Sequence, residues 1–532
     1  MKGLIYFPFF CLLVFTGSTQ TINPVWERQD PASGTTIYGA PFVMVDPFHN
    51  SVVCNGDYTP GPGTSLLTSK YDAEGNLLWQ RKYDTFGSDF MISMALDSVG
   101  GIYVGGNTIH NLITGAIPRL TVIKYGQQGD TSWLYGFDGP AVGVTYLTKL
   151  WMTEDLHLTV FGQYGDTVQL KGGLFVTQLA PNGQELWRAT YIDSLYGLVG
   201  LTARKLDDRW AFWGRYYNSV SGYRYHAWQI GEQGEDLGHA WTEVFPGLFN
   251  TQFIDRQGNL FIGDSYRYHV IKYGLNGEKK WEYDRPLPPS TVSVPARMYC
   301  IESDENSNVF IGGHLYSDLA GYQALNSKLD ASGNLEWEHF VEFNGLKEGA
   351  PVDMSWINKD LLLVTINIIT NLDSNFYELG LSIYSQDGLF SGGVSDLEGK
   401  SIFPTSNTID NNYIYIVGKN STNFLQEKQF LAKYPLNLLT PTTFPLKITQ
   451  RLNLWPNPVR DRVWVQLPEH FHANAPVMLT VTDVCNRILK RQGIPDGTHV
   501  AEVNLDGLLP GVYFVQIEDG IGKFLTGKIT KE

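Results

Sequence analysis

The side chains in this sequence that could bind a metal or perform catalysis are few and dispersed. The 532 residues contain no GxSxG nucleophile elbow, no HExxH zinc helix, no Walker loop and no GxGxxG dinucleotide turn. The closest pair of histidines is His470 and His472, and two ligands do not complete the tetrahedral shell of a zinc ion. We therefore expect no catalytic residues of a known motif, no metal site and no cofactor.

One stretch imitates the start of a calcium-binding loop. Asp304, Asn306 and Asn308 have the spacing of its first three ligands. However, Val309 and Leu315 stand where such a loop needs Gly and Glu. Similar Asp-led turns precede other strands of the chain, and Asp favours turns because it hydrogen-bonds its own backbone. We therefore expect a hairpin turn here.

A tyrosine-rich sector is the best candidate for ligand contact. Its members lie in or beside loops of variable length, and such loops on a rigid scaffold are where binding residues concentrate. We predict ligand binding, to a glycan or a protein, by the following tyrosines: Tyr216, Tyr217, Tyr223, Tyr225, Tyr266 and Tyr268.

The elements that would position these side chains follow from an internal repeat. Each copy has the end of one strand, a turn centred on Gly, and a second strand that begins near Trp, because Gly supplies the positive φ that a tight hairpin needs. The clearest copies are residues 70–79, 178–187, 272–281 and 328–337. The Trp residues stand at positions 26, 79, 133, 187, 241, 281 and 337, with spacings of 53, 54, 54, 54, 40 and 56 residues. Leu389 continues the series without a Trp.

A unit of about 50 residues with four short strands is typical of a propeller blade. The last unit, at about 403–435, has only three strands, whereas residues 24–28 form an outer strand with nothing before it. Pairing of the two would close the ring and remove exposed sheet edges. We predict an eight-bladed β-propeller at residues 20–440, with seven blades as the alternative because the unit containing Trp241 is irregular. Regular spacing favours packing between blades for the Trp side chains.

The N-terminus has the pattern of a secretory signal peptide. Lys2 is followed by an apolar run at residues 4–15 and by small residues at 16–19, which predicts a signal peptide at 1–19. The run is too short to span a membrane, and no later segment is long enough. The formal net charge of −15 disfavours nucleic acid and anionic lipid as partners, because phosphate binding needs a positive field.

Beyond a linker at residues 441–450 the repeat ends and a second pattern begins. Prolines on both sides of Asn457 fix a turn, since each restricts its own φ and that of the residue before it. Alternating strands follow at 477–482, 500–505, 512–517 and 524–529. This predicts a small immunoglobulin-like β-sandwich at 451–532, so the whole chain is expected to be all-β.

Two resemblances add to this interpretation. The Tyr/Leu-Asp-x-x-Gly-x-x-x-Trp pattern resembles the tryptophan-docking repeats of quinoprotein-like propellers, although the vicinal cysteines of quinoproteins are absent. The tail resembles the type A C-terminal sorting domain of type IX secretion cargo in Bacteroidetes. The positions that carry this second resemblance include Asn457, Pro458, Asp483, Pro510, Gly511, Tyr513 and Lys528.

The second resemblance implies a route and a destination. Cargo of this family crosses the inner membrane by its signal peptide, and the outer-membrane translocon then recognises the sorting domain. The sorting domain is commonly cleaved, and the cargo is released or attached to surface lipopolysaccharide. We therefore expect a secreted or cell-surface protein that passes through the periplasm. The hypothesis that we favour is a noncatalytic propeller that binds a glycan or a protein. The alternative is a secreted propeller hydrolase with acidic residues lining the channel.

Overall fold

The computed structural model describes most of the chain from residue 20 onward. The described residues are 20–29, 36–59, 63–85, 87–110, 117–137, 143–166, 171–193, 198–218, 222–244, 249–264, 266–285, 296–317, 321–341, 349–371, 376–388, 390–395, 401–421, 427–436, 453–455, 459–467, 477–483, 488–495, 498, 500–518 and 524–532. Several predicted features lie outside them: the signal peptide, the linker, Leu389, Asn457, Pro458, His470, His472 and Cys485. The chain divides into two compact units, one at residues 16–440 and one that contains 441–532.

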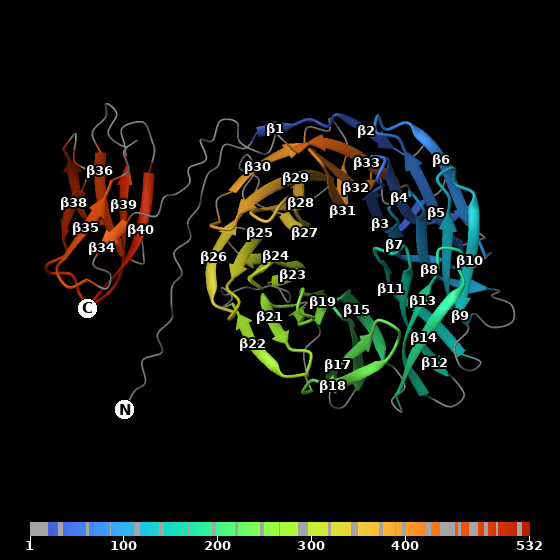
Figure 1. Cartoon of the computed structure of the whole chain (residues 1–532). Coiled ribbons are helices and arrows are strands. Elements are labelled where there is room, and N and C mark those ends of the chain that lie inside the picture. Colours follow the sequence, from blue (N-terminus) through green and yellow to red (C-terminus); the bar gives the residue numbers. More distant parts are fainter. Residues whose placement is uncertain are drawn as a thin grey trace. The chain divides into compact units, whose positions relative to one another are not determined.

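Within the described part of the first unit, the strands form eight antiparallel sheets that follow one another around a ring (Figure 1). Sheet 1 consists of β3 (Thr36–Val45), β4 (Ser51–Thr59), β5 (Gly63–Tyr71) and β6 (Leu77–Tyr83), and sheet 2 of β7 (Phe90–Leu96), β8 (Ile102–His110), β9 (Ile117–Tyr125) and β10 (Thr131–Phe137). Sheet 3 consists of β11 (Gly143–Met152), β12 (Leu158–Asp166), β13 (Lys171–Leu179) and β14 (Glu185–Asp193), and sheet 4 of β15 (Val199–Lys205), β16 (Arg209–Asn218), β17 (Gly222–Gly231) and β18 (Asp236–Trp241).

Sheets 5 to 8 continue the ring. Sheet 5 consists of β19 (Phe249–Ile254), β20 (Leu260–Asp264), β21 (His269–Tyr273) and β22 (Lys279–Asp284), and sheet 6 of β23 (Ala296–Ser303), β24 (Val309–Ser317), β25 (Gly321–Leu329) and β26 (Leu335–Phe340). Sheet 7 consists of β27 (Gly349–Trp356), β28 (Leu361–Asn371), β29 (Phe376–Ser385) and β30 (Phe390–Ser395), joined by β1 (Gln20–Ile22). Sheet 8 consists of β31 (Ile402–Asp410), β32 (Tyr413–Ser421) and β33 (Glu427–Pro435), joined by β2 (Trp26–Gln29). The first strand of each sheet lies on the inside of the ring (Figure 1).

The N-terminal segment joins the two ends of the ring. Strand β2 pairs with β33 in antiparallel register, with Trp26 opposite Lys433, so the predicted pairing of the first strand with the last unit is confirmed. Strand β1, which the sequence does not reveal, pairs in parallel with β30. Its Ile22 is 1% exposed and enters the hydrophobic core of sheets 7 and 8. Ten residues at the start of the described chain therefore connect three sheets, because Trp26 also reaches sheet 1.

Neighbouring sheets are linked by a repeated contact of Trp with the next sheet. The indole of Trp133 and the ammonium of Lys124, its cross-strand partner, both donate to the Pro181 carbonyl in the β13–β14 turn, over 3.0 and 2.9 Å. Trp337 and Lys328 do the same to the carbonyl of Gln386. Packing of the Trp side chains between neighbouring sheets, expected from their spacing, is thus confirmed.

The same contact explains the Gly at the centre of each turn. Gly333 has φ +85°, and a Cβ there would lie 2.7 Å from the ring of Trp281. Gly183 stands in the same relation to Trp133, with φ +84° and 2.9 Å. Both the conformation and the space therefore exclude a side chain at this position.

Sheet 4 departs from the expected register. In most other sheets a Trp of the outer strand pairs with the third strand at this point of the register. In sheet 4 the corresponding residue of β18 is Gly238, which lies opposite Gln229. Trp241 is three positions further on and packs against His226 and Tyr216. Trp241 is therefore not a member of the Trp series, and this corrects the sequence interpretation. The short spacing that follows reflects sheet 5, whose middle strands β20 and β21 have only five residues each.

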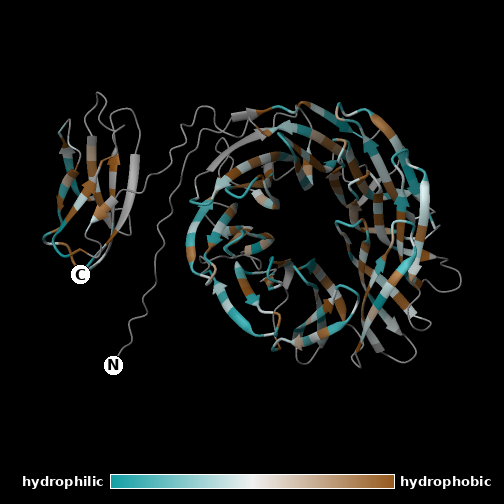
Figure 2. Cartoon of the chain, viewed as in Figure 1, coloured by the Kyte–Doolittle hydropathy of each residue, from teal (hydrophilic) through white to brown (hydrophobic). Residues whose placement is uncertain are grey.

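The core consists of a series of apolar layers between adjacent sheets. Strands β20 and β21 are buried along their whole length, whereas the outer strand β22 alternates between exposed and half-buried residues and is mostly hydrophilic (Figure 2). Between sheets 3 and 4 the layer contains the fully buried side chains of Phe161, Trp210 and Phe212. No helix among the described residues is long and apolar enough to cross a membrane.

The described part of the second unit contains two sheets. One consists of β34 (Asn453–Trp455), β35 (Arg462–Gln466) and β38 (Val500–Asn504), and the other of β37 (Ile488–Ile494), β36 (Val477–Asp483), β39 (Gly511–Glu518) and β40 (Phe524–Lys531). They share one core, which includes Val465 and Val503 from the first sheet and Val481 and Val515 from the second. The four strands expected at 477–529 are present. The immunoglobulin-like topology stays a prediction.

Replacement of Gly333 by Ala should weaken the contact between sheets 5 and 6. An L-residue at φ +85° is strained and the new methyl group would displace the Trp281 ring, so the free energy of unfolding should fall by about 1–3 kcal/mol. Chemical denaturation followed by Trp fluorescence measures this change. The control is Gly136→Ala, because the nearest atom to a Cβ at Gly136 lies 3.6 Å away. Equal stability of the two variants would contradict the proposed packing role.

His226 predicts a pH dependence of stability. The side chain is fully buried and stacked on Tyr191 at 4.3 Å, and burial, with a smaller contribution from His239, lowers its pKa to about 3. Because the unfolded chain binds the proton more tightly, the stabilisation is complete above pH 6.5 and is lost as the pH falls toward 3. The free energy of unfolding should drop by about 2 kcal/mol between pH 6.5 and 5.

Urea titrations at several pH values test this dependence. The His226→Phe variant should lose this component of the slope, whereas His157→Gln, which leaves His226 in place, should retain it. An identical slope in wild type and His226→Phe would exclude His226 as the source.

Candidate functional site

The inner wall of the ring is formed by the first strand of each sheet, and every one of these strands has a register irregularity near its middle. Such bulges re-aim side chains and increase the local twist. The residues that follow the irregularity are Phe42, Ser93, Lys149, Thr202, Thr251, Cys300, Asp353 and Ser406. The repeat thus presents one position per sheet at a similar depth on the inner wall.

At several of these positions the side chain bonds to the next sheet. The Ser93 hydroxyl accepts a hydrogen bond from the Leu150 N–H at 3.1 Å, and the Thr251 hydroxyl donates to the Met298 carbonyl at 2.8 Å. In sheet 7 the residue is an aspartate. One Asp353 oxygen accepts from the N–H of Asn407 in sheet 8 at 2.8 Å and the other from its neighbour Met354 at 2.9 Å. A hydroxyl serves this linking role in other sheets, so the charge of Asp353 exceeds what the link needs.

Asp353 has a carboxyl neighbour on sheet 6. Burial raises the pKa of Asp353 to about 7. Burial and the charge of Asp353 raise the pKa of Glu302, on β23, to about 7, although the Ser303 N–H and two cations oppose this shift. The two carboxyls therefore interact and titrate near neutral pH as a coupled pair.

The cations are Lys149 on β11 and Arg204 on β15. Burial lowers the pKa of Lys149 to about 8, with a further contribution from Arg204. Arg204 donates to the Ile254 carbonyl at 3.2 Å, and burial lowers its pKa. The inner wall is thus electropositive on sheets 3 and 4 and acidic on sheets 6 and 7.

Glu302 and Asp353 line a common cavity of about 290 Å³, which we call the acid cavity. Its other walls come from β19 and β23 and include Gln252 and Tyr299. A polar pocket with two interacting carboxyls of raised pKa is where acid–base chemistry is expected in a protein of unassigned activity.

A second cavity of about 420 Å³ shares Tyr299 and Val352 with the first. We call it the aromatic cavity. It lies between sheets 6, 7 and 8, and the rings in its wall come from all three: Tyr299, His314, Tyr322, Tyr377 and Phe403. Edge-to-face contacts fix several of the rings. His314 lies 4.8 Å from Tyr322, and Tyr377 lies 5.5 Å from Phe403.

Two polar side chains of the aromatic cavity are incompletely bonded. His314 is 9% exposed and Asn367 is 5% exposed. The His314 Nε2 and the Asn367 Oδ1 have no hydrogen-bond partner among the described residues. Burial, together with Arg297, lowers the pKa of His314 to about 4, so its ring is neutral at pH 7. The Tyr299 hydroxyl lies 3.0 Å from His314 Nδ1, and the tautomer of the ring decides which of the two donates. Nε2 is a donor in the tautomer in which Nδ1 accepts and an acceptor in the other, whereas Asn367 Oδ1 is an acceptor in either case.

The structure divides the tyrosine sector predicted from the sequence. Tyr225 and Tyr268 are 1% and 0% exposed, and the Tyr268 hydroxyl bonds to Ser327 and to the Ile311 carbonyl in sheet 6. Both are core residues that hold sheets together, so they cannot contact a ligand at the surface. The sequence could not reveal this, because alternation along a strand does not say which face meets the next sheet.

The other members of the sector lie at or near the surface. Tyr217 and Tyr266 are 54% and 46% exposed, and Tyr217 packs on Tyr223 at 4.7 Å. Tyr216 is half-buried against Trp241. The Tyr217–Tyr223 pair remains a predicted ligand contact, and it lies in the wall of neither the acid cavity nor the aromatic cavity.

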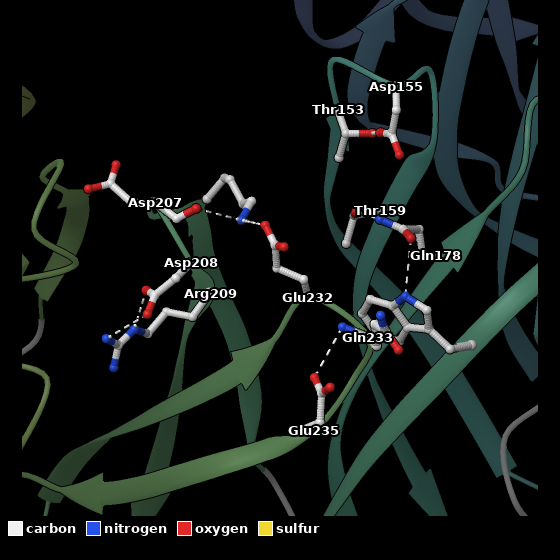
Figure 3. Close-up of polar contacts among 12 residues, drawn as sticks. Thr153, Asp155, Thr159, Gln178, Asp207, Asp208, Arg209, Glu232, Gln233 and Glu235 are labelled. Atoms are coloured by element: carbon white, nitrogen blue, oxygen red, sulfur yellow. Dashed lines mark hydrogen bonds and ion pairs between the residues drawn. The ribbon is translucent and has the colours of Figure 1, made fainter.

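The turns at the far ends of the first strands satisfy their own polar groups. In Figure 3, Glu232 pairs with Lys205, Asp208 with Arg209, and the Gln233 N–H donates to Glu235. Thr153 bonds to Asp155, and Gln178 bonds to Thr159 in the neighbouring strand. The polar side chains named here are therefore bonded to neighbours within the fold.

The calcium-like stretch is one of these self-satisfied turns. One oxygen of Asp304 accepts from the N–H groups of Asn306 and Asn308, and the other accepts from the Asn308 side chain at 2.7 Å. The expected hairpin turn is confirmed. No group of three or more His, Cys, Asp or Glu side chains within the described residues is arranged to hold a metal ion.

In the second unit, the predicted sorting residues that are described lie on β36, β39 and β40 or just before β39. Asp483 is opposite Tyr513, and Lys528 is opposite Phe514. The Tyr513 hydroxyl donates to the Leu509 carbonyl and so holds the segment that contains Pro510 and Gly511 against the sheet. Their role in sorting stays a prediction.

Glu302 and Asp353 were not singled out from the sequence, although one signal for Glu302 exists. It lies two residues before the Asp of its turn, where the other copies have Met44, Ala95 and Phe253. The other copies have an apolar residue at this position, so packing does not explain a charged residue there. Asp353 has no comparable signal, because its sheet lacks the Asp-led turn.

The comparison with known families decides the nature of the tail. Residues 453–532 match a family model described as "Secretion system C-terminal sorting domain". This tail indicates export by the type IX secretion system, to the outer membrane, the cell surface or the medium. It also indicates an interaction with the type IX machinery. No curated protein matches the chain in sequence.

The solved structures that match this chain share little sequence with it. The WD40 domain of SCAP from fission yeast has 11% identity and a TM-score of 0.41, covering 77% of this chain and 98% of that chain. Polysaccharide lyase Uly1 has 10% identity and a TM-score of 0.41, covering 78% and 93%. The extracellular domain of the putative hybrid two-component system BT4673 from B. thetaiotaomicron has 10% identity and a TM-score of 0.25, covering 94% and 75%. At these values the similarities bear on neither ligand nor activity.

Proposed function

We propose that this protein is an exported eight-bladed β-propeller that binds a glycan in the aromatic cavity. The observation that carries the proposal is a cavity walled by aromatic rings from three sheets, whose lining residues His314 and Asn367 each have a polar atom without a hydrogen-bond partner among the described residues. Aromatic faces pack against the C–H groups of a sugar ring, whereas a sugar hydroxyl is both donor and acceptor. A hydroxyl could therefore satisfy His314 Nε2 and Asn367 Oδ1 together, after a small rotation of either side chain.

The charge of the aromatic cavity also favours a neutral ligand. His314 is uncharged at pH 7, and the aromatic rings and Asn367 carry no charge. A buried polar atom without a hydrogen-bond partner costs about 1–3 kcal/mol of desolvation free energy, and a bound saccharide would offset this cost by supplying the partner. A protein ligand on the loop face, including the exposed Tyr217–Tyr223 pair, is the second candidate.

The export part of the proposal extends the sorting assignment. A signal peptide at residues 1–19 would carry the chain into the periplasm, and the domain at 451–532 would then direct it through the outer membrane. Cleavage of that domain and attachment to surface lipopolysaccharide are the further steps that the type A resemblance implies. Together these steps would display the propeller where extracellular glycans are available.

Substitution in the aromatic cavity should weaken glycan binding. The full chain should give specific binding on a glycan array, and Phe403→Ala should weaken that binding at least about tenfold, since a stacking ring is lost from a partly exposed position. Isothermal titration with the array-positive oligosaccharide measures the change.

The matched control is the double variant Tyr217→Ala, Tyr223→Ala, which removes an aromatic pair outside the cavity. It should bind like wild type. If it loses binding while Phe403→Ala retains it, the ligand occupies the tyrosine sector. A blank array for the full chain would contradict the glycan assignment and favour a protein ligand.

Deletion of residues 451–532 should block transfer across the outer membrane. In a bacterium with a type IX system, the truncated protein should accumulate in the periplasm and resist protease added to intact cells. The control is Glu502→Gln in the full chain, which removes an exposed side chain paired with Arg462 and should leave surface exposure unchanged. Surface display of the truncated protein would exclude the tail as the export signal.

A further inference from the structure

We infer that Glu302 and Asp353 hydrolyse a glycosidic bond of the saccharide held in the aromatic cavity. The inference rests on the proposed function, since it takes the glycan from there. It changes the class of the protein from a binding module to a glycoside hydrolase, and it assigns the two acidic residues distinct roles.

The two cavities are placed to act on one ligand. They share Tyr299 and Val352 in their walls and therefore adjoin, so a saccharide chain that extends from the aromatic cavity past these two residues would reach the acid cavity. Glu302 comes from β23 and Asp353 from β27, which belong to adjacent sheets. Two carboxyls that flank a glycosidic bond are the minimum that its hydrolysis needs.

Hydrogen bonding distinguishes the two carboxyls. Both oxygens of Asp353 accept backbone N–H groups, from Met354 and Asn407, and this favours its ionised form. Glu302 has one backbone N–H, that of Ser303, and lies in the field of the Asp353 carboxylate. The pair therefore holds one proton near neutral pH, and that proton resides on Glu302.

The chemical step follows from this assignment. Glu302 donates its proton to the glycosidic oxygen as the bond from that oxygen to the anomeric carbon breaks. A water molecule attacks the anomeric carbon and gives one proton to Asp353. The products are a hemiacetal and an alcohol. Transfer of that proton back to Glu302 through solvent restores the pair, so only water is consumed.

Other charged groups of the inner wall tune the pair. Lys149 and Arg204, on sheets 3 and 4, both favour the ionised form of Glu302. By opposing the effect of burial, the two cations keep the pKa of Glu302 near neutral pH, where a general acid can both hold and release its proton. Activity should therefore rise and fall around pH 7, with the limbs set by the two coupled carboxyls.

The effect of replacing Glu302 on stability can be predicted separately from its effect on activity. Its raised pKa means that the folded protein binds the proton more tightly than the unfolded chain. Stability from this group is therefore present at low pH and lost as the pH rises toward and through 7. The Glu302→Gln variant should thus be at least as stable as wild type at pH 8, so any loss of activity is not a loss of fold.

The experiment measures binding and cleavage separately on one set of probes. The full chain is incubated with the fluorescently labelled oligosaccharides of the glycan array, and labelled fragments are resolved by chromatography. Wild type should bind and cleave. Glu302→Gln should bind within about threefold of wild type but cleave at least about 100-fold more slowly. The control Glu305→Gln, an exposed acid in the turn after β23, should cleave like wild type.

The outcomes separate the two proposals. Binding without cleavage by wild type overturns the hydrolase inference and leaves the binding function intact. Cleavage at the wild-type rate by Glu302→Gln overturns the assignment of the acid. Absence of both binding and cleavage over the whole set contradicts the proposed function and the hydrolase inference together.

Discussion

The ring depends on a contact in which an indole N–H of one sheet donates to a carbonyl in a turn of the next sheet. At three of these five junctions a Lys ammonium group donates to the same carbonyl. Trp26 and Lys433 make it at the Ala73 carbonyl, both over 3.0 Å. A blade cannot bury its apolar faces alone, so the contact between sheets decides the stability of the whole. The Gly in each turn is a consequence, because the indole needs the space of its missing side chain.

Three junctions lack this contact. Trp187 of sheet 3 bonds to Gln178 of its own sheet, and sheet 4 has Gly238 at the Trp position. At the third, between sheets 7 and 8, the N-terminal segment covers the junction instead. In sheet 8 the third strand β33 and the outer strand β2 come from opposite ends of the sequence, so no turn connects them. At the junction of sheets 7 and 8, β1 adds a strand to sheet 7 and buries Ile22 between the two sheets. A short apolar strand thus takes the place of the polar contact that five other junctions of the ring have. The rigidity gained outside fixes the inner wall, where the two cavities combine residues of several sheets.

Much of this fold could be predicted from the sequence, because a repeat gives the same answer many times. The Trp spacing indicated the outer strands, and the isolated strand around Trp26 indicated ring closure. The error at Trp241 arose because a Trp three positions from the repeat position was taken for a member of the series, whereas Gly238 occupies it.

The candidate site was less accessible to sequence reasoning for a physical reason. His314, Tyr377 and Phe403 come from three sheets, and only the closure of the ring brings them together. The tyrosine sector failed in part because Tyr225 and Tyr268 face a neighbouring sheet, and alternation alone does not identify the neighbour. Glu302 could have been found as a charged residue at an apolar repeat position. Its pairing with Asp353 could not.

Ring closure by the N-terminal strand also has a consequence in time. Trp26 and Lys433 are 407 positions apart, so a strand from the start of the ring pairs with the last strand of the ring. During synthesis, sheets 1 to 7 can form in order, but β2 has no partner until the final repeat unit is available. Contacts over such a separation are slow to form, and open sheet edges invite aggregation while they wait. The closing step should therefore limit the rate of folding, and a chaperone that shields β2 or the edge of sheet 8 would act at the most vulnerable interval.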